Sequence, residues 1–185
     1  MSILAANKEP IALAEPANRI SRRQNQSPYL HSAILDNAVA LVTSAHDGQC
    51  NVMTVTFFAE SSHLPALVRV SIAPTTWTYE LIKASGRFGI NILARFQAEL
   101  ALACGTASGR GESRFARHSI PYQLGAHGVP LLRHCLTSSE CIVRESVELP
   151  GHTLFVGEIV SSFRQPSLAH HKALLVSDLI DYLSG

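Results

Sequence analysis

The residues best suited to bind a ligand are uncharged and polar, and they recur in and beside the predicted strands. The set comprises Asn51, Thr54, Thr56, Ser71, Thr75, Thr76, Thr78 and Asn91. Three of its threonines open a predicted helix, where hydroxyl groups and free backbone N–H groups suit a phosphate. Amides and hydroxyls beside strand backbone suit the hydrogen-bonding edge of a planar heterocycle. These residue types therefore point to binding chemistry more than to acid–base chemistry.

Each of these residues alone has an ordinary explanation as a strand threonine, a helix cap or a turn asparagine. Together they predict a ligand with one polar ring edge, a hydroxylated chain and one phosphate, which is the chemistry of flavin mononucleotide (FMN). The sequence lacks GxGxxG and GxxxxGK[ST] motifs, and Ser108 in TASGR is not a GxSxG elbow. If the protein is an enzyme, we expect a cofactor to carry the reaction.

The elements that must position these residues are strands joined by hairpin turns. AVALVTSA (38–45) and NVMTVTFFA (51–59) flank the turn HDGQ, whose Asp-Gly pair is typical of a tight hairpin. Further strands are predicted at 66–73, 87–93, 140–149 and 152–163, the last two joined at Pro150-Gly151. Short helices are predicted at 75–85, before Gly86, at 97–105 and at 174–183, and residues 108–120 form a polar loop with at most one helical turn.

Six strands with hairpin turns and only short helices predict a mainly β fold that forms a closed antiparallel barrel. A length of 185 residues suits one domain, which we place at 29–185. Residues 1–28 contain three prolines and a polar run, and we expect an extension that wraps over the body or over a partner subunit.

Composition limits the classes of partner. Charged residues make up 16% of the chain, against about 25% in typical domains, which favours a homodimer that hides part of its surface. A compact monomer with few surface charges is the alternative. The net charge of +1 predicts no nucleic-acid binding.

The cysteines and the hydropathy exclude further classes. Cys50, Cys104, Cys135 and Cys141 form no CxxC pair, and with His134 and His152 they match no zinc spacing, so we expect reduced thiols and no metal. No apolar run reaches the roughly 18 residues of a membrane span. We therefore predict a cytoplasmic protein.

Four segments, in order, resemble the flavin reductase-like, FMN-binding split-barrel family. NVMTVTFF after Asp-Gly resembles the family segment DGxxNxMTxS, and VRVSIAPTTWTYELIKASGRFGINIL resembles its third strand, helix and fourth strand. CGTASGRGESRF is similar to the segment CGxxSGRxxxKF of a flavoredoxin-like branch, and GHTLFVGEIV is similar to a late GxHxLFxGEV strand. The resemblance runs from about residue 38 to 164 and implies an antiparallel split β-barrel.

The resemblance also implies roles for particular residues. Asn51, Met53, Thr54, Val55 and Thr56 would line the isoalloxazine ring and the ribityl chain, while Ser71 and Ile72 would contribute backbone groups at the ring edge. Thr78, with Thr75 nearby, would reach the phosphate, and Asn91 belongs to the same polar set. Lys83, Arg87 and Arg110 are the candidate cations for this phosphate. His152 matches the family histidine near the nicotinamide of NAD(P)H.

Three departures from the family pattern concern the expected site. Thr56 and Phe57 stand where many members have serine and tryptophan, and ESSHLPA replaces a segment with two prolines. We expect ESSHLPA to border the active site.

The leading functional prediction is an NAD(P)H-dependent flavin reductase that uses FMN or FAD and supplies reduced flavin to a monooxygenase. A flavoredoxin-like electron carrier that holds FMN tightly and exchanges electrons with a protein partner is the alternative. A split barrel that binds FMN without turnover, or that has lost it, is the third possibility.

Overall fold

The computed structural model of this protein describes residues 36–106 and 113–184. The predicted extension 1–28 and the candidate cation Arg110 lie outside these residues, and the domain boundary at residue 29 stays a prediction. Among the helices of the described residues, none has the length and apolar content needed to cross a membrane.

The first hairpin forms as the sequence predicts. Strand β1 (Ala40–His46) pairs with β2 (Gln49–Val55) in antiparallel register, from Ala40 opposite Val55 to His46 opposite Gln49. Asp47 and Gly48 form the turn with positive φ angles of 48° and 73°. Asp-Gly tolerates this left-handed backbone, so the turn residues set the register of the whole hairpin.

The segment NVMTVTFFA was predicted as one strand, and this prediction is wrong. Strand β2 ends at Val55, and a separate strand β3 (Phe58–His63) begins after Thr56 and Phe57. Strand β3 pairs with β4 (Ala66–Ile72), with a bulge between Glu60 and Ser62. The break lets the chain leave β1 at Val55 and join a different part of the sheet at Phe58.

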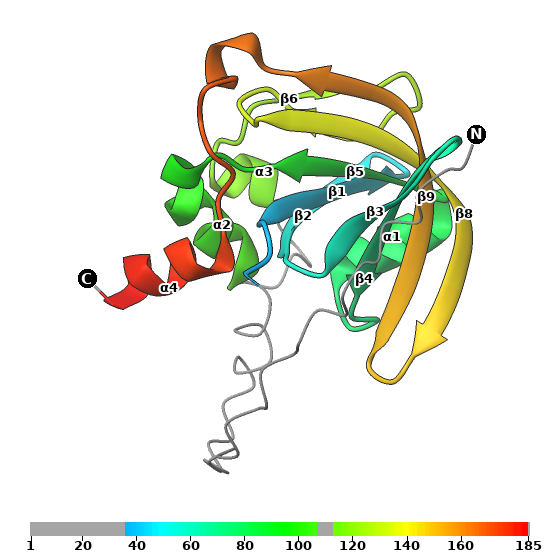
Figure 1. The fold of residues 1–185 in the computed structure, drawn as a ribbon. Helices are drawn as coiled ribbons and strands as arrows, with labels where there is room; N and C mark the ends of the chain where they lie inside the picture. Colours follow the sequence, from blue (N-terminus) through cyan, green and yellow to red (C-terminus); the bar gives the residue numbers. More distant parts are fainter. Residues whose placement is uncertain (1–35, 107–112, 185) are drawn as a thin grey trace, which may run out of the picture.

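The main sheet has seven strands in the order β2-β1-β5-β8-β9-β4-β3 (Figure 1). Its remaining strands are β5 (Arg87–Ile92), β8 (Thr137–Leu149) and β9 (His152–Arg164). In the described residues β2 pairs only with β1 and β3 only with β4, so the sheet curls but does not close. The split barrel is therefore confirmed, whereas the closed barrel expected from the strand count is wrong.

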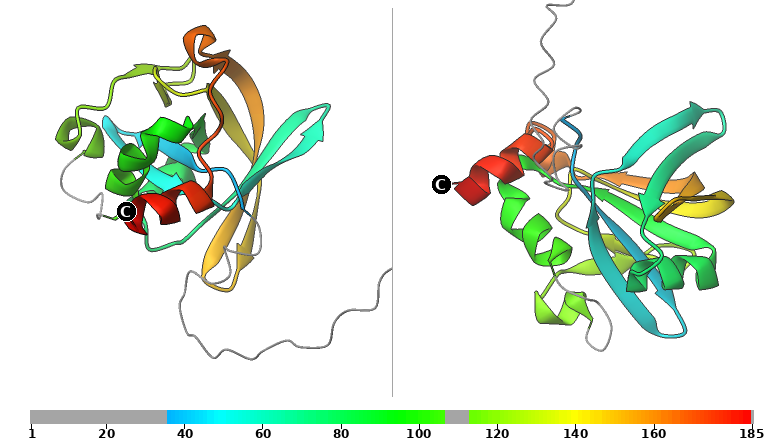
Figure 2. Two further views of the ribbon diagram at one scale, coloured as in Figure 1. Left: turned by 60° about the vertical axis from the view of Figure 1, so that its left-hand side comes forward. Right: turned by 90° about the horizontal axis from the view of Figure 1, so that it is seen from below.

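Short helices occupy the two sides of the β1–β2 hairpin. The helices are α1 (Trp77–Ser85), α2 (Ala98–Gly105), α3 (Arg114–Arg117) and α4 (Val176–Ser184), with 3-10 turns η2 (Arg95–Gln97) and η3 (Pro166–Leu168). Helix α1 lies on one side of the hairpin, and α2, α3 and α4 lie on the other (Figure 2). A two-stranded sheet of β6 (Tyr122–Leu124) and β7 (Pro130–Leu132), which the sequence analysis missed, completes the fold.

Strand β1 separates two hydrophobic cores. Val39 and Leu41 pack in a core with residues of α2, α3 and β7, while Ala40 and Val42 pack inside the curled sheet. Successive strand residues point to opposite faces, so burial on both faces explains why β1 is an almost continuous apolar run. Strand β2 lies at the edge of this doubly packed region and leaves its outer side free for other groups.

Candidate flavin site

A cavity of about 190 Å³ lies at the outer edge of β2, between the start of α1 and the end of α2. It brings together four segments that are far apart in the sequence. Its lining residues are Asn51, Met53, Thr54, Thr75, Thr76, Trp77, Thr78, Cys104, Gly105 and Arg114. Asn51, Met53, Thr54, Thr75 and Thr78 were predicted as site residues, so the structure places five members of the predicted set around one cavity.

The N-terminus of α1 lies at the wall of the cavity. Thr76 caps the helix by accepting a hydrogen bond from the backbone N–H of Tyr79 at 3.3 Å. Gly86 ends the helix in a left-handed conformation with φ 67°. Aligned peptide dipoles and free N–H groups at a helix start favour negative charge. The cap and the glycine thus fix the positive end of α1 at the wall of the cavity.

A hydrogen bond joins β2 to the start of α1. The Asn51 side chain donates from Nδ2 to Thr78 Oγ1 at 3.0 Å, and both residues are buried. Because Thr78 Oγ1 accepts this bond, its own hydrogen is directed to another acceptor. The Thr78 hydroxyl therefore keeps its hydrogen for an acceptor other than Asn51.

Arg114 supplies positive charge from the other side of the cavity. Its side chain is buried, and its Nη1 atom donates to the backbone oxygen of Val52 on the outer edge of β2 at 2.7 Å. Burial is the main reason that the pKa of its guanidinium is lowered, although arginine stays protonated at neutral pH. Within residues 36–106 and 113–184, the buried side-chain N or O atoms that lack a partner are Arg114 Nε and Asn51 Oδ1. Both belong to residues of this cavity.

The orientation of β2 places further backbone groups at the cavity. The carbonyl of Val52 points to the free edge, and groups two residues apart in a strand point the same way. The backbone N–H and C=O of Thr54 therefore face the outer edge as well. The Thr54 hydroxyl is already used, since it donates to the backbone oxygen of Ala101 in α2. We infer that Thr54 meets a ligand through its backbone.

His152 lies beside Phe57 at the break between β2 and β3. The two rings meet edge to face, with centroids 6.1 Å apart and planes at 72°. Phe57 is 48% exposed, and His152 is the first residue of β9. Thr153 pairs with Ile72 at the end of β4, which leads into α1. The pair therefore lies at the end of the sheet where α1 begins.

Other predicted residues are placed differently. Val55 and Ile72 belong to the core inside the curled sheet, and Thr56 lies half-buried at the strand break. The backbone N–H of Ser71 donates to the backbone oxygen of Phe57 at 2.9 Å, so this N–H is already bonded within the protein and does not offer the ring-edge contact that was expected of it. The segment ESSHLPA contributes no residue to the cavity lining, contrary to expectation, because β3 carries it away from the site.

Asn91 has a structural environment. It is fully buried, and its Nδ2 atom donates to the backbone oxygen of Leu41 at 2.9 Å and to Thr43 Oγ1 at 3.4 Å. Its Oδ1 atom accepts from the backbone N–H of Leu132 at 2.9 Å. The amide joins β5 to β1 and β7, and Asn91 does not line the cavity.

Two of the side chains predicted to bind the phosphate lie at the C-terminal end of α1, away from the cavity at its N-terminus. Lys83 is in the last turn of the helix over the Tyr79 ring, and Arg87 follows the helix at the start of β5. Arg114 was missed as a site residue. The signal was present, because Arg114 stands where the similar segment CGxxSGRxxxKF has its lysine. Sequence spacing alone could not show that this position returns to β2.

The buried thiols are not nucleophiles at neutral pH. Burial raises the pKa of Cys104, which lines the cavity, to about 11, and raises the pKa values of Cys135 and Cys141 to about 12. The thiol of Cys104 is therefore protonated and acts as an apolar wall. In the described residues no group of three or more His, Cys, Asp or Glu side chains could hold a metal ion.

Comparison with known proteins identifies the family. The sequence model of the family described as "Flavin reductase like domain" matches residues 32–178. The chain is 33% identical over 145 residues to the NADH-dependent FMN reductase AsuE2 of Streptomyces nodosus subsp. asukaensis, covering 75% of this chain and 77% of that protein.

Two further relatives agree with this assignment. The reductase component of the 4-nitrophenol 4-monooxygenase/4-nitrocatechol 2-monooxygenase of Rhodococcus opacus is 31% identical over 126 residues, covering 68% of this chain and 65% of that protein. The structure of an FMN-binding protein from Thermus thermophilus superposes with a TM-score of 0.71 and 27% identity, covering 81% of this chain and 82% of that chain. The chain therefore belongs to the flavin reductase-like family.

Proposed function

We propose that this protein is an NADH-dependent flavin reductase that binds FMN at the outer edge of β2. The observation that carries this proposal is the pair of buried atoms without partners, Asn51 Oδ1 and Arg114 Nε, at one cavity beside the start of α1. A buried unpaired polar group costs about 1–3 kcal/mol, so such a pair is expected where a ligand completes the bonding. The required ligand has a donor for Asn51 and an acceptor for Arg114.

FMN fits these requirements. Its phosphate would accept from Arg114, from the Thr78 hydroxyl and from the N–H groups at the start of α1. Its ribityl hydroxyls can donate to Asn51 Oδ1. The backbone of Thr54 at the free strand edge offers a donor and an acceptor to the polar edge of the ring.

When bound, FMN supplies the chemistry of accepting a hydride from reduced nicotinamide. The side chains of this chain would bind and orient the flavin and the nucleotide. They would also exclude water from the site. Phe57 and His152 are the groups we assign to the nicotinamide nucleotide, because they are partly exposed beside one another at the end of the sheet where α1 begins. The imidazole can hydrogen-bond a carboxamide in either protonation state.

The names of the relatives support the reaction and suggest a partner. One relative is an NADH-dependent FMN reductase, and another is the reductase component of a two-activity monooxygenase. We propose that this protein passes reduced flavin to a monooxygenase, and that it does so in the cytoplasm.

We also propose a homodimer. Large apolar side chains are exposed at the free end of the β8–β9 hairpin, where Val147 is 44% and Leu149 is 45% exposed, close to His152 in the strand register. A second copy covering this end would bury them beside the nucleotide site. Light scattering should give twice the 20.0 kDa of one chain, and a mass equal to one chain would contradict the dimer.

The function is tested by stopped-flow reduction of the FMN complex with NADH and with NADPH. We expect rapid bleaching of the flavin by NADH, and His152→Ala should raise KM for NADH or slow reduction while the Kd of FMN stays unchanged. His170→Ala is the matched control, since His170 is exposed and lies outside the assigned site.

Each alternative outcome has a distinct meaning. Tight FMN binding with negligible reduction by either nucleotide would reject the reductase and favour an electron carrier. Rapid reduction that His152→Ala leaves unchanged would keep the reductase but reject His152 as the nucleotide contact.

A further inference from the structure

Helix α4 carries an apolar stripe that the rest of the described chain covers at one end only. The stripe follows the i, i+3, i+4, i+7 spacing of one helix face and consists of Val176, Leu179, Ile180 and Leu183. Val176 is 8% exposed, and Leu179 packs against a buried core. Ile180 and Leu183 are 49% and 70% exposed. The stripe therefore continues past the edge of the core, and both views of Figure 2 show α4 at the rim of the fold.

The start of α4 is tied to the first described residues of the chain. Asp36 accepts from the backbone N–H of Ser177 at 3.0 Å and from its hydroxyl at 2.8 Å. The backbone N–H of Val176 donates to the backbone oxygen of Asn37 at 3.0 Å. Residues 29–35, which precede Asp36, are therefore attached at the first turn of α4, beside the apolar stripe.

The composition and length of residues 29–35 suit the exposed end of the stripe. Five of the seven residues in YLHSAIL are apolar and none is acidic. Helix α4 has two carboxylates, Asp178 and Asp181, and no basic residue, so this segment adds no like charge beside them. Seven extended residues span up to about 23 Å, and a nine-residue helix is about 14 Å long. The segment can therefore reach from the first turn of α4 to Leu183.

Attachment favours this segment over a second copy of the chain as the cover. A tether of a few residues gives an effective concentration on the order of millimolar. A second copy has to bind from solution, and a standard interface takes about 20–30 residues from each partner, against nine in α4. A surface of this size fits a short peptide segment better than a subunit.

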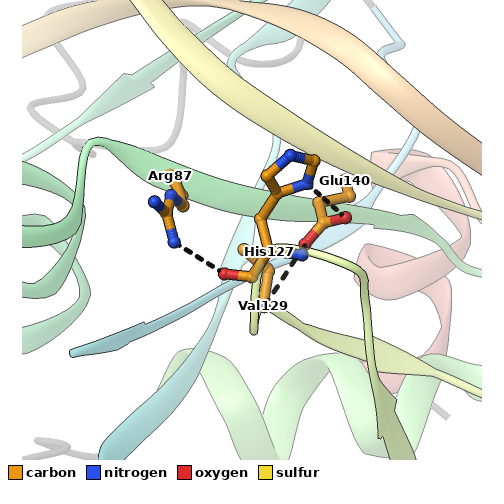
Figure 3. A network of polar contacts seen from close by, with 4 residues as sticks. All are labelled: Arg87, His127, Val129 and Glu140. Carbon is orange, nitrogen blue, oxygen red and sulfur yellow. Dashed lines mark hydrogen bonds and ion pairs between the residues drawn. The ribbon is translucent and has the colours of Figure 1, made fainter. Parts of the chain in front are cut away.

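The loop before β7 shows how another surface segment is fixed by polar contacts (Figure 3). Glu140 is fully buried, accepts from the backbone N–H of His127 at 2.9 Å and faces His127 Nδ1 at 3.1 Å. Arg87 Nη1 donates to the backbone oxygen of His127 at 2.9 Å. Ala126, exposed in this loop, is therefore a fixed surface position for comparison with the end of α4.

We propose that residues 29–35 dock on the exposed end of the α4 stripe in the same chain. Apolar contacts with this segment would remove Ile180 and Leu183 from water. They would also hold α4 against α2, whose last residues Cys104 and Gly105 line the flavin cavity. The inference does not depend on the reaction at that cavity.

Disulfide trapping in the full chain tests the docking. Cys50→Ser first removes the one native thiol that is not buried. Leu30→Cys combined with Leu183→Cys should then form an intramolecular disulfide with oxidised glutathione, seen as a faster band of monomer size on a non-reducing gel. The matched control combines Leu30→Cys with Ala126→Cys. This control pair should react about tenfold more slowly, because docking raises the local concentration of residue 30 only near α4.

Two results of the trapping would overturn the docking. Equal rates for the two cysteine pairs would mean that residues 29–35 have no preference for α4. A disulfide that joins two chains, seen as a band of dimer size, would assign the apolar end of α4 to a second copy.

Proteolysis gives a second readout without new cysteines. Chymotrypsin cleaves after aromatic residues and leucine, so Tyr29 and Leu30 are cleavage sites in the segment. Leu183→Asp should speed cleavage there about tenfold, because cleavage follows the fraction of chains in which the segment has left α4. Leu124→Asp, at a position of β6 that is 63% exposed, is the matched control and should leave the rate unchanged. Cleavage of the wild type as fast as that of Leu183→Asp, with the cut located by mass spectrometry, would overturn the docking.

Discussion

The outer edge of β2 and the interior of β5 both flank β1, and each contains an asparagine that the sequence marks as a candidate ligand. Asn51 and Asn91 are 1% and 0% exposed, so burial does not separate them. The amide of Asn91 is bonded at both ends within the protein, whereas Asn51 bonds only through Nδ2 and its Oδ1 has no partner. Unused hydrogen-bonding capacity, and not residue type, distinguishes the proposed binding region from the structural one.

The largest difference between the region of Asn51 and the region of Asn91 should appear in the free energy of unfolding. Asn91→Leu keeps a similar side-chain volume but removes the side-chain bond to the carbonyl of Leu41 and the acceptor of the Leu132 N–H. We expect the free energy of unfolding to fall by about 3 kcal/mol, measured by urea titration. Folded protein should still bind FMN with an unchanged Kd. A loss of FMN affinity at full folding would place Asn91 in the binding region after all.

The second effect concerns Arg114 and the phosphate. Arg114→Met should weaken FMN binding about 10–100-fold. This equals the loss of a charged hydrogen bond worth about 1.5–3 kcal/mol. The affinity for riboflavin, which has no phosphate, should change little. Fluorescence titration of both ligands measures this, with Arg133→Met at an exposed position as the control. Equal weakening of FMN and riboflavin would show that Arg114 supports β2 and does not bind the phosphate.

The third test makes the same substitution at the other asparagine. Asn51→Leu removes one hydrogen bond to Thr78 and one unpaired oxygen, so the unliganded protein should lose only about 1 kcal/mol. FMN binding should weaken about fivefold to tenfold, the reverse of the pattern for Asn91→Leu. If Asn51→Leu destabilises the unliganded protein as much as Asn91→Leu does, the distinction between the two regions fails.

The smallest effect is a pH dependence at the cavity wall. The pKa of Cys104 is about 11 in the folded protein against an ordinary value of 9.0, so its stabilising contribution is complete below pH 9 and is lost as pH rises through 11. Alanine does not titrate. Relative to Cys104→Ala, wild type should therefore lose about 1 kcal/mol between pH 8 and pH 10, read from unfolding curves at each pH. A constant difference would mean that the thiol is not desolvated in the folded state.

Local signals in the sequence were enough for much of the fold. Asp47-Gly48 fixed a hairpin turn, and Thr76 and Gly86 marked both ends of α1, because turns and caps depend on residues close in sequence. The break between β2 and β3 at Thr56 and Phe57 could not be recognised in the sequence. An apolar run has the same pattern whether it continues beside one partner or changes partner, and only the pairing of Phe58 with Val70 shows the change.

The site was predictable where it depended on one segment and not where it depended on several. Asn51, Thr54 and Thr78 follow from their places on β2 and α1. A motif position marked Arg114, but its bond to Val52 joins residues 62 apart in the sequence, a contact that local patterns do not show. The structural role of Asn91 was hidden for the same reason, since Leu41 and Leu132 are remote in the sequence.

The bulge between Glu60 and Ser62 has a consequence for the behaviour of the protein at high concentration. Strand β3 ends the sheet, and a regular edge strand offers evenly spaced N–H and C=O groups to which another chain can add a strand. The extra residue breaks this spacing and increases the local twist. Glu60, exposed beside the bulge, adds charge that a docking strand would have to bury. The same strand that ends the curled sheet is therefore a poor template for aggregation, which favours solubility in the crowded cell.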